Sequence, residues 1–125
     1  LSLLEGGLLD TFPDLDFVFA TLGIGAIVQA ARGGKFGRDA TGHRPNVYFD
    51  TMGDDPRIVR ALVDFFGAER VLAGTDWPIL ASLSRDRLAA SLSEAGLSDS
   101  EQRLIAGGNA RRILRLHAAQ AQAAE

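Results

Sequence analysis

Two carboxylates stand at the ends of short apolar runs, where they could do chemistry. Asp76 follows the run 71–74, and Asp50 stands near the end of the run 47–51. A buried parallel strand delivers its last side chains to the carboxyl edge of a sheet, where α/β proteins place their chemistry. A carboxylate there is a suitable hard ligand for a divalent cation, or a base. Asp76 is therefore the first candidate for a functional residue, and capping of the turn before Pro78 is the alternative.

Two further side chains belong to the same predicted edge. Thr21 comes directly after the apolar run 15–20, and Trp77, the only tryptophan, follows Asp76. Parallel strands would line up Thr21, Asp50 and Asp76 along one edge. We expect Thr21, Trp77 and Asp50 to contact a substrate there. Packing beneath a loop is the alternative for Trp77, and simple stabilisation of the strand end is the alternative for Asp50.

The sequence offers few nitrogen or sulfur ligands for a metal ion. It contains no cysteine and two histidines, His43 in a polar stretch and His117 near the C-terminus. Neither histidine is predicted at a strand end, and a metal site needs about three or four protein ligands. This chain alone is therefore not expected to complete a metal site.

The elements that position these residues alternate between strands and helices. Runs 15–20, 47–51 and 71–74 are predicted as strands, because turn-forming or charged residues bound each of them. Helices are predicted over residues 1–12, from residue 25, from Pro56, over 85–95, after Ser98 and from Asn109. The alternation of strands and helices implies a parallel sheet with right-handed crossovers.

Capping residues support two of these helices. Asp54 or Asp55 can cap the helix that begins at Pro56, since proline is well suited to the first helical position. Ser98 and Glu101 have the spacing of a capping box for a later helix. Both patterns predict where a helix begins.

The C-terminal end is predicted as a helix followed by a tail. Asn109 is expected to cap this helix, with Ile113, Leu114 and Leu116 buried. Residues 117–125 are rich in alanine and are expected to fray. No low-complexity linker interrupts the chain, so residues 1–125 are interpreted as a single domain.

The composition narrows the possible partners and locations. Of the 125 residues 46% are hydrophobic, the formal net charge is −3, and the 13 lysines and arginines are scattered. These features argue against nucleic acid as a partner. No apolar run approaches the roughly 18 residues of a membrane span, and no signal peptide is evident. A cytoplasmic location is the default expectation.

Three stretches resemble the amidohydrolase-related family, in particular the branch typified by aminocarboxymuconate-semialdehyde decarboxylase. GGLLDTFPDLDFVFATLGIGA is similar to that family's sixth barrel strand with the preceding helix, and VYFDTMGDDP to its seventh strand. FGAERVLAGTDWPI and the later IAGGNARRIL are similar to its eighth strand and closing helix. The resemblance implies an α/β fold, the C-terminal part of a (β/α)₈ TIM-type barrel with about strands six to eight. It also implies that Asp76 contacts a catalytic divalent metal, with zinc the expected ion.

The chain departs from the family pattern in two respects. Thr21 stands where the sixth strand of the family normally ends in histidine, and threonine cannot act as an imidazole acid or base. The histidines of the family's first and fifth strands are missing, and a full barrel usually needs about 250 residues. The expectation is therefore the C-terminal part of a longer enzyme, with most metal ligands outside this chain.

The resemblance implies a metal-dependent hydrolase or a non-oxidative decarboxylase that acts on a small carboxylated compound, aromatic compounds included. In this interpretation Asp76 binds the metal and relays a proton. The alternatives are a catalytically inactive homologue that works as a binding or assembly module, and a hydrolase that needs no metal. Three parallel strands leave two open edges and an apolar face, so the missing N-terminal barrel segment or a second copy is the expected partner.

Overall fold

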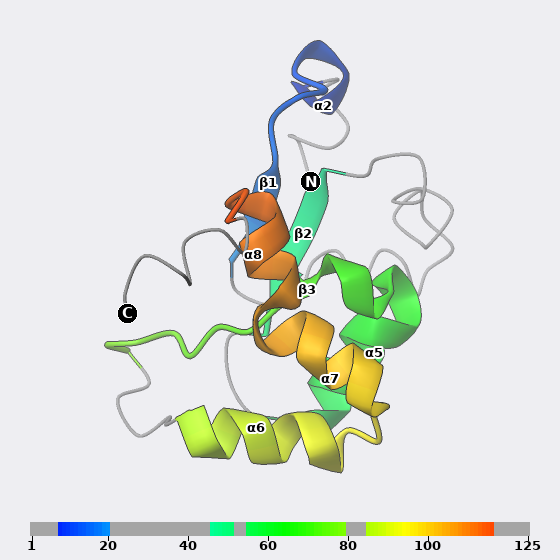
Figure 1. Cartoon of the computed structure of the whole chain (residues 1–125), viewed down its shortest axis with the longest axis vertical. Coiled ribbons are helices and arrows are strands. Elements are labelled where there is room, and N and C mark those ends of the chain that lie inside the picture. Colours follow the sequence, from blue (N-terminus) through cyan, green and yellow to red (C-terminus); the bar gives the residue numbers. More distant parts are fainter. Residues whose placement is uncertain (1–7, 21–45, 52–54, 80–84, 117–125) are drawn as a thin grey trace, which may run out of the picture.

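A three-stranded parallel sheet forms the centre of the molecule (Figure 1). The computed structural model describes residues 8–20, 46–51, 55–79 and 85–116. The strands are β1 (Phe17–Phe19), β2 (Val47–Asp50) and β3 (Val71–Leu72), in the order β1-β2-β3. Phe19 lies opposite Phe49, and Phe49 lies opposite Val71. The predicted parallel sheet is confirmed.

Helices pack beside the sheet and beyond its C-terminal strand. Their bounds are α2 (Leu8–Thr11), α5 (Pro56–Phe66), the 3₁₀ turn η2 (Ala68–Arg70), α6 (Arg85–Glu94), α7 (Asp99–Arg103), the π-helical segment η3 (Leu104–Gly108) and α8 (Asn109–Ile113). α5 contacts α6, and β3 contacts η3 and α8. In Figure 1, α6 extends along the end of the molecule away from α2.

The core lies between the sheet and α5, because alternate strand residues point to the same face. Phe49 of β2 and Val71 of β3 are buried together with Leu62 and Phe66 of α5. The rings of Phe49 and Phe66 stack with 4.3 Å between their centroids, and the Phe19 ring stacks with Phe49 at 5.9 Å. Full burial of such a side chain stabilises the fold by about 1.5–3 kcal/mol.

The first turn of α5 is fixed as its sequence predicts. The Asp55 carboxylate accepts a hydrogen bond of 2.9 Å from the Arg57 amide, and Pro56 occupies the first helical position. Hydrogen bonds from the Arg57 side chain and amide lower the pKa of Asp55 to about 2. The cap therefore stays charged down to strongly acidic pH. Gly67 ends α5 with φ of 85°, a conformation that favours glycine.

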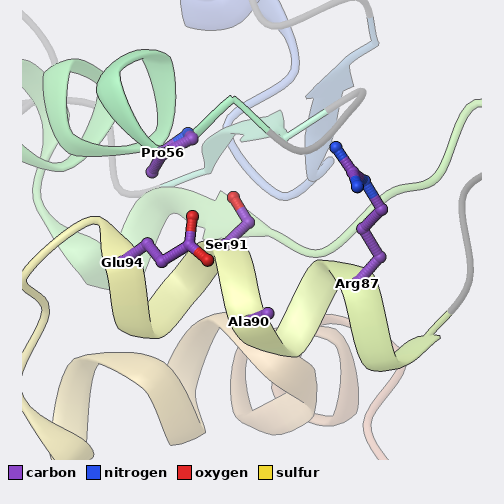
Figure 2. Close-up of a pocket in the computed structure, with 5 residues that line it drawn as sticks. All are labelled: Pro56, Arg87, Ala90, Ser91 and Glu94. Carbon is purple, nitrogen blue, oxygen red and sulfur yellow. The ribbon is translucent and has the colours of Figure 1, made fainter.

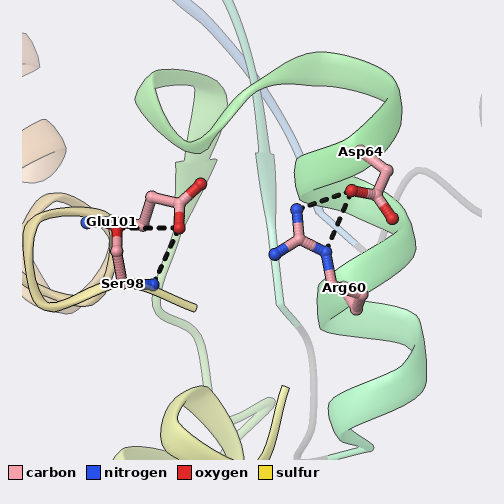
Figure 3. Close-up of polar contacts among 4 residues, drawn as sticks. All are labelled: Arg60, Asp64, Ser98 and Glu101. Atoms are coloured by element: carbon pink, nitrogen blue, oxygen red, sulfur yellow. Dashed lines mark hydrogen bonds and ion pairs between the residues drawn. The ribbon is translucent and has the colours of Figure 1, made fainter. Parts of the chain in front are cut away.

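The predicted capping box at the start of α7 is confirmed (Figure 3). The Ser98 hydroxyl accepts a hydrogen bond from the Glu101 amide at 3.3 Å, and the Ser98 amide donates to the Glu101 carboxylate at 2.8 Å. The hydrogen bonds from Ser98 lower the pKa of Glu101. Figure 3 also shows the pair of Arg60 and Asp64, one turn apart on α5.

Replacing Ser98 with alanine is expected to lower the free energy of unfolding by about 1 kcal/mol, because the box loses one of its two reciprocal bonds. The measurement is urea unfolding of the natural-length protein, meaning this chain with whatever sequence accompanies it in the native polypeptide. Ser93→Ala, an exposed change within α6, is the control and should leave stability nearly unchanged. Equal stability of the two variants would contradict the capping role.

The prediction for Asn109 is wrong, and so is the predicted burial of two leucines. The helical path kinks at Gly107 (φ 174°, ψ −16°), and Asn109 already has helical dihedral angles (φ −66°, ψ −43°), so it is not at a capping position. Asn109 is instead fully buried, and its side-chain amide donates to the carbonyls of Ala68 at 2.8 Å and Val71 at 2.7 Å. Leu114 and Leu116 follow the end of α8 and are 66% and 50% exposed. Their burial was predicted from helical periodicity, but the helix ends before both residues.

The strands are shorter than predicted, because side chains take over the backbone bonds at their ends. The side-chain amide of Asn46 donates to the Leu15 carbonyl at 2.7 Å, and the Thr51 hydroxyl forms hydrogen bonds with the backbone of Gly74. The predictions for Thr21, the helix from residue 25 and the tail 117–125 lie outside the described residues. Within the described ranges, no helix is both long and apolar enough to cross a membrane.

Candidate functional site

The carboxyl ends of β2 and β3 lie side by side, as the strand pattern predicts. Asp50 is opposite Leu72, and the Thr51 amide continues the pairing with a 2.9 Å hydrogen bond to the Leu72 carbonyl. Beyond this point the ladder is replaced by one side chain. Thr51 Oγ1 accepts a hydrogen bond from the Gly74 amide and donates one to the Gly74 carbonyl, both 3.0 Å long.

The Asp50 side chain lies against the segment that leads to Asp76. A Cβ atom built on Gly74 would be 3.0 Å from Asp50 Oδ2 and 3.2 Å from Asp50 Cβ. Any side chain at position 74 would therefore press on the Asp50 carboxylate. A side chain at position 74 would require the Asp50 side chain to shift by a few tenths of an ångström, so the strand-end carboxylate of β2 and the segment that leaves β3 are in close contact.

Asp76 has an unusual backbone conformation at this edge. Its φ is 54°, in the left-handed region that residues other than glycine seldom adopt. Aspartate tolerates this region better than most residues, and such conformations gather at functional sites. The Asp76 residue is partly buried, whereas the next residue, Trp77, is 75% exposed. Trp77 is therefore exposed at the surface of the described part of the chain, where no loop covers it.

The described residues do not complete a metal site. Among them, no group of three or more histidine, cysteine, aspartate or glutamate side chains is placed to hold a metal ion. The strand ends supply the carboxylates of Asp50 and Asp76, whereas His43 and His117 lie outside the described residues. Carboxylates are suitable ligands for a divalent cation, but a complete site would need more ligands than these two.

A cavity that the sequence did not predict lies between the start of α5 and one face of α6 (Figure 2). Its volume is about 150 Å³, and it is lined by Pro56, Arg87, Ala90, Ser91 and Glu94. The Ser91 hydroxyl is buried and has no hydrogen-bond partner among the described residues. The space is polar and large enough for ordered water, although the Ser91 oxygen itself has almost no accessible surface.

Comparison of the sequence with family models places the chain in a known superfamily. Residues 1–116 match the model described as amidohydrolase, so the chain belongs to the amidohydrolase family. No curated protein matches the chain at a significant level.

Solved structures show the same fold. A dihydroxybenzoic acid decarboxylase of a Polaromonas species, with bound manganese and an inhibitor, is 22% identical with a TM-score of 0.70 and covers 91% of this chain and 38% of its own. The 5-carboxyvanillate decarboxylase of Sphingomonas paucimobilis is 22% identical, with a TM-score of 0.68, over 92% of this chain and 38% of its own. An amidohydrolase of Burkholderia multivorans with bound zinc is 22% identical, with a TM-score of 0.66; the match covers 92% of this chain and 50% of the amidohydrolase.

These likenesses define the architecture. The chain spans about 38% of the length of the two decarboxylases, which are TIM-type barrels. Its parallel strands and packed helices are thus part of a (β/α)₈ barrel, as the resemblance implied. In such barrels the functional residues come from the carboxyl ends of the strands, which is where Asp50, Thr51 and Asp76 lie.

Proposed function

We propose that this chain forms the C-terminal portion of the barrel of an enzyme, and that this enzyme hydrolyses or non-oxidatively decarboxylates a small carboxylated compound. The enzyme uses a divalent cation, zinc or manganese, and Asp76 is one of its ligands. The remaining ligands come from outside the described residues. The missing barrel segment or a second copy is the proposed partner that supplies them and covers the open sheet.

One observation carries this proposal: Asp76 emerges from β3 at the carboxyl edge in a left-handed conformation. A backbone conformation of this kind is retained where the surroundings impose it, and it often serves a functional group. The carboxylate of Asp76 holds a negative charge for a cation and accepts a proton from a reacting group. A bound divalent cation would supply Lewis acidity toward a substrate carbonyl or carboxylate.

The substrate class is proposed from the side chains at the edge and from the named activities of the solved relatives. Two of those relatives are decarboxylases whose substrates, by name, are aromatic acids. Trp77 offers an exposed ring on which a planar aromatic compound could stack. Thr21 and Asp50 are the other proposed substrate contacts, with Asp50 beside Gly74 at the strand end.

Removal of the metal tests this proposal. The natural-length protein is treated with a chelator, and CO₂ release from a panel of hydroxybenzoates and hydrolysis of small lactones and amides are measured. Because a metal ion contributes several kcal/mol of transition-state stabilisation, the chelated protein should lose activity by about 10²-fold or more and regain it with Mn²⁺ or Zn²⁺. A protein that binds neither metal and turns over none of these compounds would instead be a binding module.

A further inference from the structure

One buried hydroxyl holds the backbone that leads to Asp76. Thr51 is 1% exposed, and its Oγ1 bonds both the amide and the carbonyl of Gly74 at 3.0 Å. The regular pairing of β3 ends at Leu72, so these two bonds extend the contact with β2 by two residues. A single side chain thereby fixes the residue two positions before Asp76.

Gly74 needs such restraint, because glycine has more backbone freedom than any other residue. The Asp50 side chain lies close beside it, within 3.0 Å of where a Cβ atom would stand, and glycine itself has no side chain to limit its conformation. Asp76, two residues later, has φ of 54°, and such a conformation persists only where the surroundings determine it. The Thr51 hydroxyl supplies this determination from the β2 side.

We propose that Thr51 is a positioning residue: its hydroxyl sets the backbone of Gly74 and so orients Asp76 at the strand-end edge. This inference rests on the proposed function, in which Asp76 contributes to the binding of a divalent cation. Thr51 acts through Asp76, since its Oγ1 is already engaged in both bonds with Gly74.

Two substitutions separate the hydroxyl from the shape of Thr51. Thr51→Val keeps the shape and removes the hydroxyl, whereas Thr51→Ser keeps the hydroxyl and removes a buried methyl group. The probe is Mn²⁺ alone, titrated calorimetrically into the metal-free natural-length protein well below its unfolding temperature. Removal of a group that orients a metal ligand typically costs about 10-fold to 100-fold in affinity. We expect Thr51→Val to weaken Mn²⁺ binding by about tenfold, and Thr51→Ser to retain the wild-type affinity.

Thermal unfolding of the same variants distinguishes positioning from general stability. Thr51→Ser should lower the unfolding midpoint, because it loses a buried methyl group, but it should not weaken Mn²⁺ binding. If the role of Thr51 were purely structural, Mn²⁺ affinity would instead fall together with stability. Ser91→Ala is the matched control, since it removes another buried hydroxyl, one without a hydrogen-bond partner in the part of the chain that the structure describes. It should leave Mn²⁺ affinity unchanged.

Asp76→Asn provides the reference that separates the two proposals. If Asp76→Asn weakens Mn²⁺ binding and Thr51→Val does not, the positioning role is overturned and the proposed function stands. If Asp76→Asn leaves the affinity unchanged, both proposals fail. Should Thr51→Val not fold, a tenfold loss of affinity in Thr51→Ser would still overturn the positioning role, because that variant retains the hydroxyl.

Discussion

Asp76→Asn is expected to lower kcat by about 10²-fold to 10⁴-fold, the range typical for loss of a group that transfers a proton in the transition state. Asparagine has nearly the same shape but carries no charge and cannot accept a proton at neutral pH. The measurement is steady-state turnover of the natural-length protein with saturating metal, using the substrate found in the chelation experiment. Stability should change little, because Asp76 lies in a partly exposed turn beyond β3.

The matched control for this variant is Asp14→Asn. Asp14 is exposed in the turn that precedes β1, at the amino end of the sheet. Its substitution removes the same charge but should leave kcat unchanged. Turnover by Asp76→Asn within a few-fold of the wild-type rate would refute the functional role of this carboxylate. A similar loss in both variants would trace the effect to net charge.

The largest expected effect on stability comes from Asn109→Asp, an isosteric change. Asn109 is fully buried, and its amide group donates to the carbonyls of Ala68 and Val71. A carboxylate cannot donate, so both buried carbonyls lose a partner, at about 1–3 kcal/mol each. Urea unfolding should show a loss of about 3 kcal/mol, since the Arg112 guanidinium, which donates to Asn109 Oδ1 at 3.1 Å, offsets part of the cost of the charge but cannot replace the two lost donors.

Gln102→Glu makes the same chemical change at a less buried position. The Gln102 amide donates a single hydrogen bond of 2.8 Å to the Leu97 carbonyl, in a partly buried setting. Water can replace this donor, so we expect a loss of at most about 1 kcal/mol. If the two variants prove equally stable, the Asn109 hydrogen bonds do not hold β3 to the C-terminal helices.

The parts of the fold with local signals could be predicted from the sequence. The Asp55 cap with Pro56, and the capping box of Ser98 and Glu101, are patterns within four residues, and both helices begin where expected. Two apolar runs that each end near a carboxylate predicted that Asp50 and the segment before Asp76 lie at the same edge of the sheet. The parallel pairing of β2 with β3 places them there.

The sequence could not predict contacts between distant residues. The Thr51 hydroxyl meets Gly74 from 23 positions away, and Asn109 meets Ala68 from 41 positions away. Asparagine is a common helix cap, so its local context pointed to a cap. Only the irregular turn of η3 shows that Asn109 is inside the helical segment and faces β3. The roles of Thr21, Trp77 and Asp50 toward a substrate stay predictions.

The outer margin of β3 is closed by the chain itself. The Ala73 amide donates to the Ile105 carbonyl of η3 at 3.1 Å, and the Val71 carbonyl accepts from Asn109. A strand margin with free donors and acceptors is a template for unwanted pairing between molecules. A foreign strand arriving beside Val71 and Ala73 would have to displace both of these bonds. Any strand that pairs on the β3 side, including one that completes the barrel, must therefore first replace these two bonds, whereas β1 forms the opposite margin of the described sheet.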